Sequence, residues 1–216
     1  MIRWWWALVR FGFRLLYNEF AFTYDLVSSI VSLGAWRCWV RSSLTHLPAG
    51  GRVLELAHGT GNLQLDLAAR GYDAIGFDLS PAMGRIAQRK LVRHGVRARL
   101  IRGRAQVLPF RSQSFDAVVS TFPTDFILSS ETMREVYRVL ERGGRLIIVP
   151  NTRFTGGGIF AALLDRLYLI TGQHEAQTEF GTEVAAWLTP CGFDARIVEE
   201  QCPRSVVSVI VAEKRD

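Results

Sequence analysis

The sequence predicts an α/β domain in which helices cover both faces of a seven-stranded, mostly parallel sheet with an antiparallel last strand. Two observations carry this prediction. Strand-like and helix-like stretches alternate from about residue 49 to the end of the chain, which is the pattern of a parallel sheet between two helical layers. A glycine-rich turn also follows the first strand-like stretch. The 216 residues, 49% of them hydrophobic, suffice for one such core and exclude a disordered chain.

Each expected element rests on its own local pattern. Apolar and β-branched runs predict strands at residues 51–57, 73–78, 98–102, 115–121, 145–150, 193–199 and 205–213. Helices are expected from the glycine turn through residue 70, after Ser80, and at residues 130–142, 158–172 and 182–189. Ser80 is expected to cap its helix with Pro81 at the first position, and Gly143-Gly144 to end the helix that begins at residue 130. Ligands of such sheets bind at the carboxyl ends of the strands.

A cofactor site is predicted where the first two strands end. The first strand runs into Ala57-His58-Gly59-Thr60-Gly61, and glycine there lets the backbone approach a ligand closely. The second strand ends at Asp78, nineteen residues after Gly59. A carboxylate at that place accepts hydrogen bonds from both hydroxyls of a ribose. The pair predicts a cofactor that contains adenosine.

Two further features decide which cofactor. Residues 59–64 read GTGNLQ, so the third glycine of a dinucleotide fingerprint is absent. Residues 103–119 (GRAQVLPFRSQSFDAVV) and 135–149 (EVYRVLERGGRLIIV) resemble two later motifs of the class I methyltransferases, which are Rossmann-like three-layer sandwiches. That resemblance implies S-adenosyl-L-methionine as cofactor and S-adenosyl-L-homocysteine as product.

The N-terminal part narrows the resemblance. Residues 17–39 (YNEFAFTYDLVSSIVSLGAWRCW) resemble the corresponding segment of the ubiquinone/menaquinone biosynthesis C-methyltransferases, with Ala21, Tyr24-Asp25, Ser32-Leu33-Gly34, Arg37 and Trp39 in register. Matching stretches cover residues 17 to 150, whereas the last third of the chain is not clearly similar. The fold and the cofactor therefore carry over better than the quinone substrate.

The resemblance implies a set of cofactor contacts. Thr60 would lie beside the methionine portion, Asp78 at the ribose, Arg104 and Ala105 at the adenine, and Tyr24 over the carboxylate end. The full expected set is Tyr24, Glu55, Ala57, His58, Gly59, Thr60, Gly61, Asp78, Leu79, Met83, Arg104, Ala105, Gln106, Thr121 and Phe122. No metal is expected.

Two residues depart from the family pattern. Ala57 stands where a first glycine is common, and one methyl group is a small addition. Arg104 stands where Asp or Asn usually faces the adenine amino group, and arginine has no acceptor for that hydrogen. Either the backbone of Ala105 and Gln106 takes over adenine recognition, or Arg104 points elsewhere.

Candidate catalytic groups are few, because the methyl group of a sulfonium is already activated and alignment supplies much of the rate. His58, inside the glycine turn, is either a base or acceptor-orienting group, or a residue that only shapes the turn. Asp125 lies just after the fourth strand, where acceptors enter, or it caps a helix. His174 and Glu175 fit a solvated loop better than a lid, and Tyr17 fits core packing better than a pocket.

Residues 1–48 are predicted to form a helical lid or membrane-surface segment ahead of a methyltransferase domain at residues 49–216. Five of the six tryptophans fall there, namely Trp4, Trp5, Trp6, Trp36 and Trp39. Arg3, Arg10 and Arg14 share one side of a helix, opposite Trp5, Leu8, Phe11, Phe13 and Leu15. Together with the net charge of +6, this favours docking on anionic lipid. Packing over the sheet edge and a dimer contact are the alternatives.

Neither a metal site nor a disulfide framework is expected from Cys38, Cys191 and Cys202, which are scattered and lack paired histidines. The apolar run at residues 4–9 is too short to span a bilayer and lacks a signal-peptide cleavage site. The expected location is the cytoplasm, peripheral at the inner face of the membrane.

The leading functional hypothesis is methyl transfer to a lipophilic small molecule, either a quinone precursor or a phospholipid amine headgroup. Alternatives are a soluble metabolite as acceptor and a cofactor-binding scaffold without catalysis. Nucleic acid is disfavoured as a partner, because no RNA-binding module is recognised in the sequence.

Overall fold

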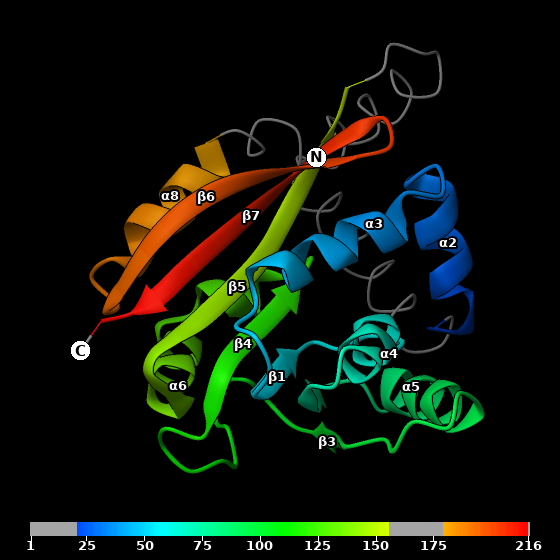
Figure 1. The fold of residues 1–216 in the computed structure, drawn as a ribbon, viewed down its shortest axis with the longest axis horizontal. Helices are drawn as coiled ribbons and strands as arrows, with labels where there is room; N and C mark the ends of the chain where they lie inside the picture. The colour runs from blue at the N-terminus through cyan, green and yellow to red at the C-terminus, as the bar shows by residue number, and fades with distance from the viewer. Residues whose placement is uncertain (1–20, 156–178, 216) are drawn as a thin grey trace, which may run out of the picture.

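The computed structural model describes residues 21–155 and 179–215. Its centre is a seven-stranded sheet with the order β3-β2-β1-β4-β5-β7-β6 (Figure 1). The strands are β1 (Arg52–Leu56), β2 (Asp73–Asp78), β3 (Leu100–Arg102), β4 (Phe115–Thr121), β5 (Leu140–Phe154), β6 (Phe193–Cys202) and β7 (Ser205–Lys214). Strands β1 to β5 pair in parallel, and β7 runs antiparallel to both β5 and β6. The predicted sheet, including its antiparallel last strand, is confirmed.

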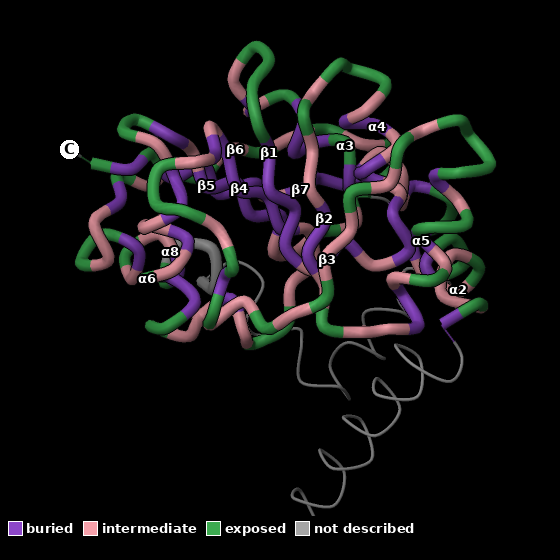
Figure 2. The backbone as a smooth tube through the Cα atoms, turned by 90° about the horizontal axis from the view of Figure 1, so that it is seen from below, coloured by how far each residue is buried: buried purple, intermediate pink, exposed green. Residues whose placement is uncertain are grey.

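Helices cover both faces of this sheet. They are α2 (Tyr24–Val31), α3 (Trp36–Arg41), α4 (Asn62–Ala69), α5 (Pro81–Arg93), α6 (Ser130–Val139) and α8 (Glu179–Leu188), with short 3-10 turns η1 (Ala21–Thr23), η2 (Ser42–His46) and η3 (Asp125–Leu128). Alternate residues of β1 face opposite layers, because side chains alternate along a strand. Leu54 and Leu56 pack with α6 and α8, whereas Val53 packs with α3, η2 and α4. The buried backbone accordingly concentrates in the strands (Figure 2).

Most of the expected elements lie where the sequence places them. The strands at residues 73–78 and 115–121 have the expected bounds, and the Oγ of Ser80 accepts a hydrogen bond from the Met83 amide at 3.2 Å, which confirms the helix cap. The expected helix at residues 158–172 lies outside the described residues.

Several boundaries in the second half were wrong: the strand expected at residues 145–150 runs to Phe154, and the strand expected at residues 193–199 runs to Cys202. The helix expected at residues 130–142 ends at Val139, and β5 starts at Leu140 rather than at Arg145. The reason is pairing across the sheet, since Leu140 is already opposite Phe115 of β4. Gly143-Gly144 therefore lies within an irregular stretch of strand and does not end the helix.

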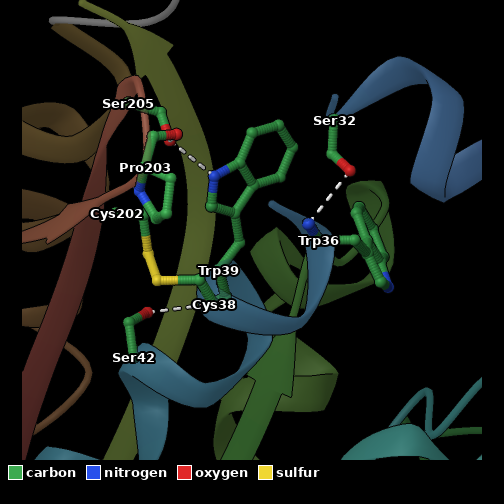
Figure 3. The surroundings of a disulfide bond; sticks show 8 residues. All are labelled: Ser32, Trp36, Cys38, Trp39, Ser42, Cys202, Pro203 and Ser205. Carbon is green, nitrogen blue, oxygen red and sulfur yellow. Dashed lines mark hydrogen bonds between the residues drawn. A yellow bond between two sulfur atoms is a disulfide. The ribbon is translucent and has the colours of Figure 1, made fainter. Parts of the chain in front are cut away.

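The described part of the N-terminal segment packs closely on the sheet. Trp39 and Val40 of α3 and Leu44 of η2 are buried in the same cluster as Val53 of β1. The Trp39 indole Nε1 also donates to Ser205 Oγ at the start of β7, at 2.8 Å (Figure 3). Residues 35–47 thus share a hydrophobic core with the sheet, and residues 1–20 are outside the described part of the chain. No helix within the described ranges has both the length and the apolar character that a bilayer span requires.

A disulfide joins Cys38 of α3 to Cys202 at the end of β6 (Figure 3). The expectation of no disulfide is therefore wrong. The two residues are 164 positions apart in sequence, and only the packing of α3 beside the β6–β7 turn brings them together. Cys191 is free. A crosslink that closes so long a loop restricts the unfolded chain strongly.

Replacing Cys38 and Cys202 together by serine is expected to lower the free energy of unfolding by about 2–5 kcal/mol, because the unfolded chain regains the freedom that the crosslink removes. Guanidinium denaturation measures the change. Dithiothreitol should shift the wild-type midpoint toward that of the double variant and leave the double variant unmoved. The Cys191→Ser variant is the control and should keep the wild-type response to the reductant. A wild-type denaturation midpoint that does not shift when the disulfide is fully reduced would contradict the prediction.

Candidate active site

The turn after β1 is tied to the end of β2 by the Asp78 carboxylate. Asp78 Oδ2 accepts a hydrogen bond from the Gly59 amide at 3.0 Å, and Oδ1 accepts one from the Ser80 amide at 2.7 Å. The two expected halves of the ribose site, the glycine turn and the acid, are therefore in direct contact. Each carboxylate oxygen has lone pairs left for further hydrogen bonds.

The turn needs left-handed backbone at Ala57, Gly59 and Gly61, where φ is 57°, 53° and 80°. At Gly61 a side chain is also excluded by space, since a Cβ would lie 2.9 Å from the Ala87 Cβ of α5. At Gly59 a Cβ would meet nothing within 4 Å, so open space lies above the turn. Ala57 has the conformation that favours glycine, at a cost of about 1–2 kcal/mol. Its amide, which donates to Phe77 O at 2.8 Å, holds it there.

Helix α2 rests on the turn through a cluster of four polar residues. Asp25 Oδ1 accepts hydrogen bonds from Thr60 Oγ1 at 2.6 Å and from Asn62 Nδ2 at 3.0 Å. The Lys90 ammonium, from α5, donates to Asp25 Oδ2 at 2.6 Å, to Asn62 Oδ1 at 2.8 Å and to Thr60 Oγ1 at 3.2 Å. Burial alone would raise the pKa of Asp25, but the hydrogen bonds and the charge of Lys90 outweigh it and the pKa is lowered. The cluster is thus an ion pair that fixes α2 over Thr60.

Glu55, expected among the cofactor contacts, lies beneath the turn. It is only 2% exposed, and its Oε2 accepts a hydrogen bond from Gln64 Nε2 of α4 at 2.7 Å. Burial raises the pKa of this carboxyl to about 8; the Gln64 hydrogen bond opposes that shift, whereas the charges of Asp78 and Asp66 add to it. Glu55 is therefore mostly protonated at neutral pH and lies within the layer that supports the site.

The ring of His58 lies on the β2 side of the turn. A Cβ on Gly76 would meet the His58 ring at 2.9 Å, so the imidazole packs over the backbone of β2. His58 Nδ1 is 2.9 Å from Gly59 O, a carbonyl that can only accept, so Nδ1 carries the proton and Nε2 the lone pair. Burial lowers the pKa of His58 despite the opposing charge of Asp78. The imidazole is therefore neutral, as a base must be.

A cavity of about 430 Å³ opens beside Asp78 and His58, between α5 and β3. Its other lining residues are Ser80, Pro81, Gly84, Arg85, Gln88, Arg89, Leu100, Ile101 and Arg102. Of the expected cofactor residues, only His58 and Asp78 line it. Thr60 instead contacts Asp25 of α2, and Tyr24 is the first residue of that helix. The expected set is thus divided between the cavity and the contact of the turn with α2.

The residues expected at the adenine flank the ends of β2 and β3. Leu79, directly after Asp78, is 61% exposed, so an unusually open apolar surface adjoins the carboxylate. Arg104 is exposed, whereas Ala105 and Gln106 are half-buried. Met83 is buried at the start of α5 with Ala21 and takes part in the packing of α2.

Aromatic side chains gather beside the turn at the end of β4. Phe122, which follows Thr121, stacks on Trp36 with ring centroids 4.7 Å apart, and Tyr24 meets the edge of Trp36 at 6.0 Å. Trp39 contacts both Trp36 and Phe122. Because Tyr24 precedes Asp25, this aromatic cluster (Tyr24, Trp36, Trp39 and Phe122) adjoins the Thr60 side of the turn.

The structure gives fewer contacts for the other catalytic candidates than for His58. Asp125 is exposed and is the first residue of η3, where Thr124 holds the N-cap position without a capping hydrogen bond to its side chain. His174, Glu175 and Tyr17 lie outside the described residues.

Sequence reasoning missed the partners of Thr60. Asp25 was matched to a family segment but was not placed at the site, and Lys90, one of only two lysines in the sequence, was not considered for it. An isolated lysine in an arginine-rich chain was the available signal.

These residues fit a cofactor that contains adenosine. The Asp78 carboxylate is fixed for a ribose, the exposed Leu79 side chain offers an apolar surface for a base, and the open space at Gly59 admits a ligand close to the backbone.

Comparisons with known proteins identify the family of this chain. Residues 53–144 match the family described as methyltransferase domain. A demethylmenaquinone methyltransferase of Thermus thermophilus is 34% identical over 188 residues, covering 81% of this chain and 86% of the relative. The ubiquinone/menaquinone biosynthesis C-methyltransferase of Xylella fastidiosa is 35% identical over 141 residues, and the match spans 55% of its length.

A solved structure extends the likeness to the fold. An S-adenosylmethionine-dependent methyltransferase of Thermotoga maritima superposes with a TM-score of 0.63 at 20% identity, over 93% of this chain and 98% of that one. At this identity the likeness concerns the fold, and it includes the sheet and the helices on both faces.

The raised pKa of Glu55 predicts a dependence of stability on pH. The folded chain keeps a proton on Glu55 up to about pH 8, whereas the unfolded chain loses it near pH 4.5. The unfolding free energy should therefore fall as pH rises through this window and level off above it. In Glu55→Gln the side chain is neutral at every pH, so the stability of the variant relative to the wild type should rise with pH between these values.

Urea denaturation at several pH values measures that difference. Glu135→Gln is the control. Its carboxyl is paired with Arg138 and has a lowered pKa, so its difference from the wild type should stay nearly constant over the same window. A Glu55→Gln difference that is equally flat would show that Glu55 titrates normally.

Proposed function

Because the chain belongs to the family of ubiquinone/menaquinone biosynthesis C-methyltransferases and is an S-adenosylmethionine-dependent methyltransferase, we propose that its acceptor is a lipophilic ring compound, a quinone precursor. The observation that carries this proposal is the aromatic cluster beside the turn. Trp36 and Phe122 stack on each other and are half-buried, so they leave apolar ring surface, which suits an aromatic acceptor better than a charged metabolite.

Different side chains around the turn would bind different parts of the cofactor. When bound, the cofactor supplies a methyl group already activated on a sulfonium. Asp78 would hold the ribose, Leu79 and Ala105 the adenine, and Thr60 with Tyr24 the methionine end. The aromatic cluster would align the acceptor ring, and alignment of this kind is worth about 7–11 kcal/mol in well-oriented reactions.

A proton must also leave when the acceptor is a phenolic ring. Neutral His58 has a lone pair on Nε2, but its ring packs against Gly76 on the side away from the aromatic cluster. Asp125 is exposed beyond the end of β4. Of these two candidates, the position of Asp125 next to the end of β4 favours it for contact with the acceptor.

We place this reaction at a membrane surface, since a lipophilic quinone precursor is dissolved in the bilayer. The pI of 9.7 and the net charge of +6 favour contact with anionic lipid.

Replacing Asp78 by alanine should weaken binding of S-adenosylmethionine about 10- to 100-fold, because hydrogen bonds to a charged group contribute about 1.5–3 kcal/mol. Isothermal titration calorimetry measures the dissociation constant. Asp73→Ala is the matched control, since Asp73 lies at the other end of β2 and pairs with Arg52 on the surface. Equal affinities of the Asp78 variant and the wild type for S-adenosylmethionine would show that Asp78 does not contribute to cofactor binding.

The acceptor class is tested by methyl transfer from labelled S-adenosylmethionine to a total lipid extract dispersed in detergent. The label should partition into the organic phase and migrate with isoprenoid quinones. Label on a phospholipid amine would replace the quinone proposal with a headgroup reaction. Label that stays in water-soluble metabolites would reject a lipophilic acceptor, and the Asp78→Ala variant should transfer none.

A further inference from the structure

Helix α2 and the residues that flank it expose a continuous apolar ridge. Leu26 and Ile30 are four residues apart and so share one side of α2, while Phe22 and Leu33 flank the helix at its two ends. Phe22 is 73% and Leu26 is 63% exposed. These four make up half of the eight large apolar side chains that are exposed in the described part of the chain. Such clustering marks an interaction surface, whereas single exposed apolar residues do not.

The ridge is held outward because the other side of α2 is fixed to the domain. Asp25 is bonded to Thr60 and Lys90, Ser28 is buried, and Ala21 packs with Met83 of α5. The apolar ridge therefore cannot turn inward without breaking the Asp25–Lys90 ion pair.

Helix α5 lies beside α2 and carries a basic ridge. The two helices are adjacent in both views of the molecule, and the Lys90–Asp25 ion pair joins them (Figures 1 and 2). Arg85, Arg89 and Arg93 recur every four residues along α5 and are exposed. None of the three belongs to an ion pair among the described residues. Three positive charges outside these ion pairs thus lie on the helix next to the apolar ridge, and two of them, Arg85 and Arg89, are at the rim of the cavity beside Asp78.

We infer that the apolar ridge of α2 and the basic ridge of α5 together form a docking surface for an anionic lipid bilayer. Apolar side chains on a helix enter the boundary between headgroups and acyl chains, while neighbouring arginines bind lipid phosphates. A symmetric dimer through the apolar ridge would bring two arginine ridges together, and a nucleic acid would have no use for the apolar residues. The combination of the two ridges therefore favours a bilayer over both.

The inference rests on the proposed function and adds a route to the site. Docking through this surface places α2 between the bilayer and the glycine turn. The inner side of α2 carries Tyr24 of the aromatic cluster and Asp25 on Thr60. A lipophilic acceptor that leaves the bilayer along α2 would reach the aromatic cluster without crossing water.

The test is co-sedimentation of the full chain with phosphatidylcholine vesicles, prepared with and without phosphatidylglycerol. The wild type should bind the anionic vesicles more tightly. Leu26→Ser with Ile30→Ser should lower the affinity for both kinds by at least about ten-fold. Arg85→Gln with Arg89→Gln should lower it for anionic vesicles only, by about five-fold for each arginine.

Arg196→Gln with Ile197→Ser is the matched control, because both residues are exposed on β6 at the opposite edge of the sheet. It should bind like the wild type, and circular dichroism checks that every variant is folded. Wild-type binding by the Leu26/Ile30 and Arg85/Arg89 variants would overturn the inference and assign any docking to another surface. Absence of binding by the wild type would overturn it too.

Measurements of activity and of oligomeric state distinguish failure of the docking surface from failure of the proposed function. The Leu26/Ile30 variant should methylate detergent-dispersed lipid as fast as the wild type and lose activity only on vesicle-borne lipid. If no form of the chain methylates detergent-dispersed lipid, the proposed function fails, whatever the vesicles show. A dimer of the wild type that the Leu26/Ile30 variant loses in size-exclusion chromatography would assign the apolar ridge to a second copy of the chain and overturn the docking surface.

Discussion

The hydrogen bond from the Gly59 amide to the Asp78 carboxylate joins the ends of two neighbouring strands, and the site is built around it. It measures 3.0 Å and links the turn after β1 to the last residue of β2. The turn can reach Asp78 only because Ala57, Gly59 and Gly61 adopt left-handed backbone. The parallel pairing of β1 with β2, from Arg52 opposite Asp73 to Leu56 opposite Phe77, brings the two strand ends level. The position of the acid is thus a consequence of sheet register, and its orientation is a consequence of the turn.

A second layer of contacts places α2 over this turn. Partial burial of the Asp25–Lys90 ion pair has a desolvation cost, and hydrogen bonds to Thr60 and Asn62 offset it. The pair connects three elements that are far apart in sequence, namely α2, the turn and α5. The disulfide from Cys38 to Cys202 and the hydrogen bond from Trp39 to Ser205 hold the following helix against the far end of the sheet. The aromatic cluster lies between these two attachments, so both sides of the expected acceptor site rest on fixed backbone.

The sequence was informative where the physical cause is local. The strands before Gly59 and up to Asp78 are mostly apolar, and Ser80-Pro81 is a helix N-cap followed by proline at the first helical position, so their places could be predicted. The contacts that complete the site are not local. Asp25 and Lys90 are 65 residues apart, and nothing in their spacing predicts an ion pair.

The same reason explains the disulfide and the early end of α6. Cysteine spacing says nothing of pairing across 164 residues. The periodic pattern of α6 continues past Val139, but strand pairing of Leu140 with Phe115 ends the helix first. The orientation of the His58 ring could not be predicted from the sequence either, because it depends on the space that Gly76 leaves on the neighbouring strand.

We propose that the turn and Asp78 bind the cofactor, with α2 covering its methionine end. A crystal structure of the full chain with S-adenosylhomocysteine tests it most directly. The account predicts ribose hydroxyls on the Asp78 carboxylate, the adenine against Leu79 and Ala105, and the amino-acid end beside Thr60 under α2. A ligand bound elsewhere, with the Asp78 carboxylate still holding only the Gly59 and Ser80 amides, would contradict it.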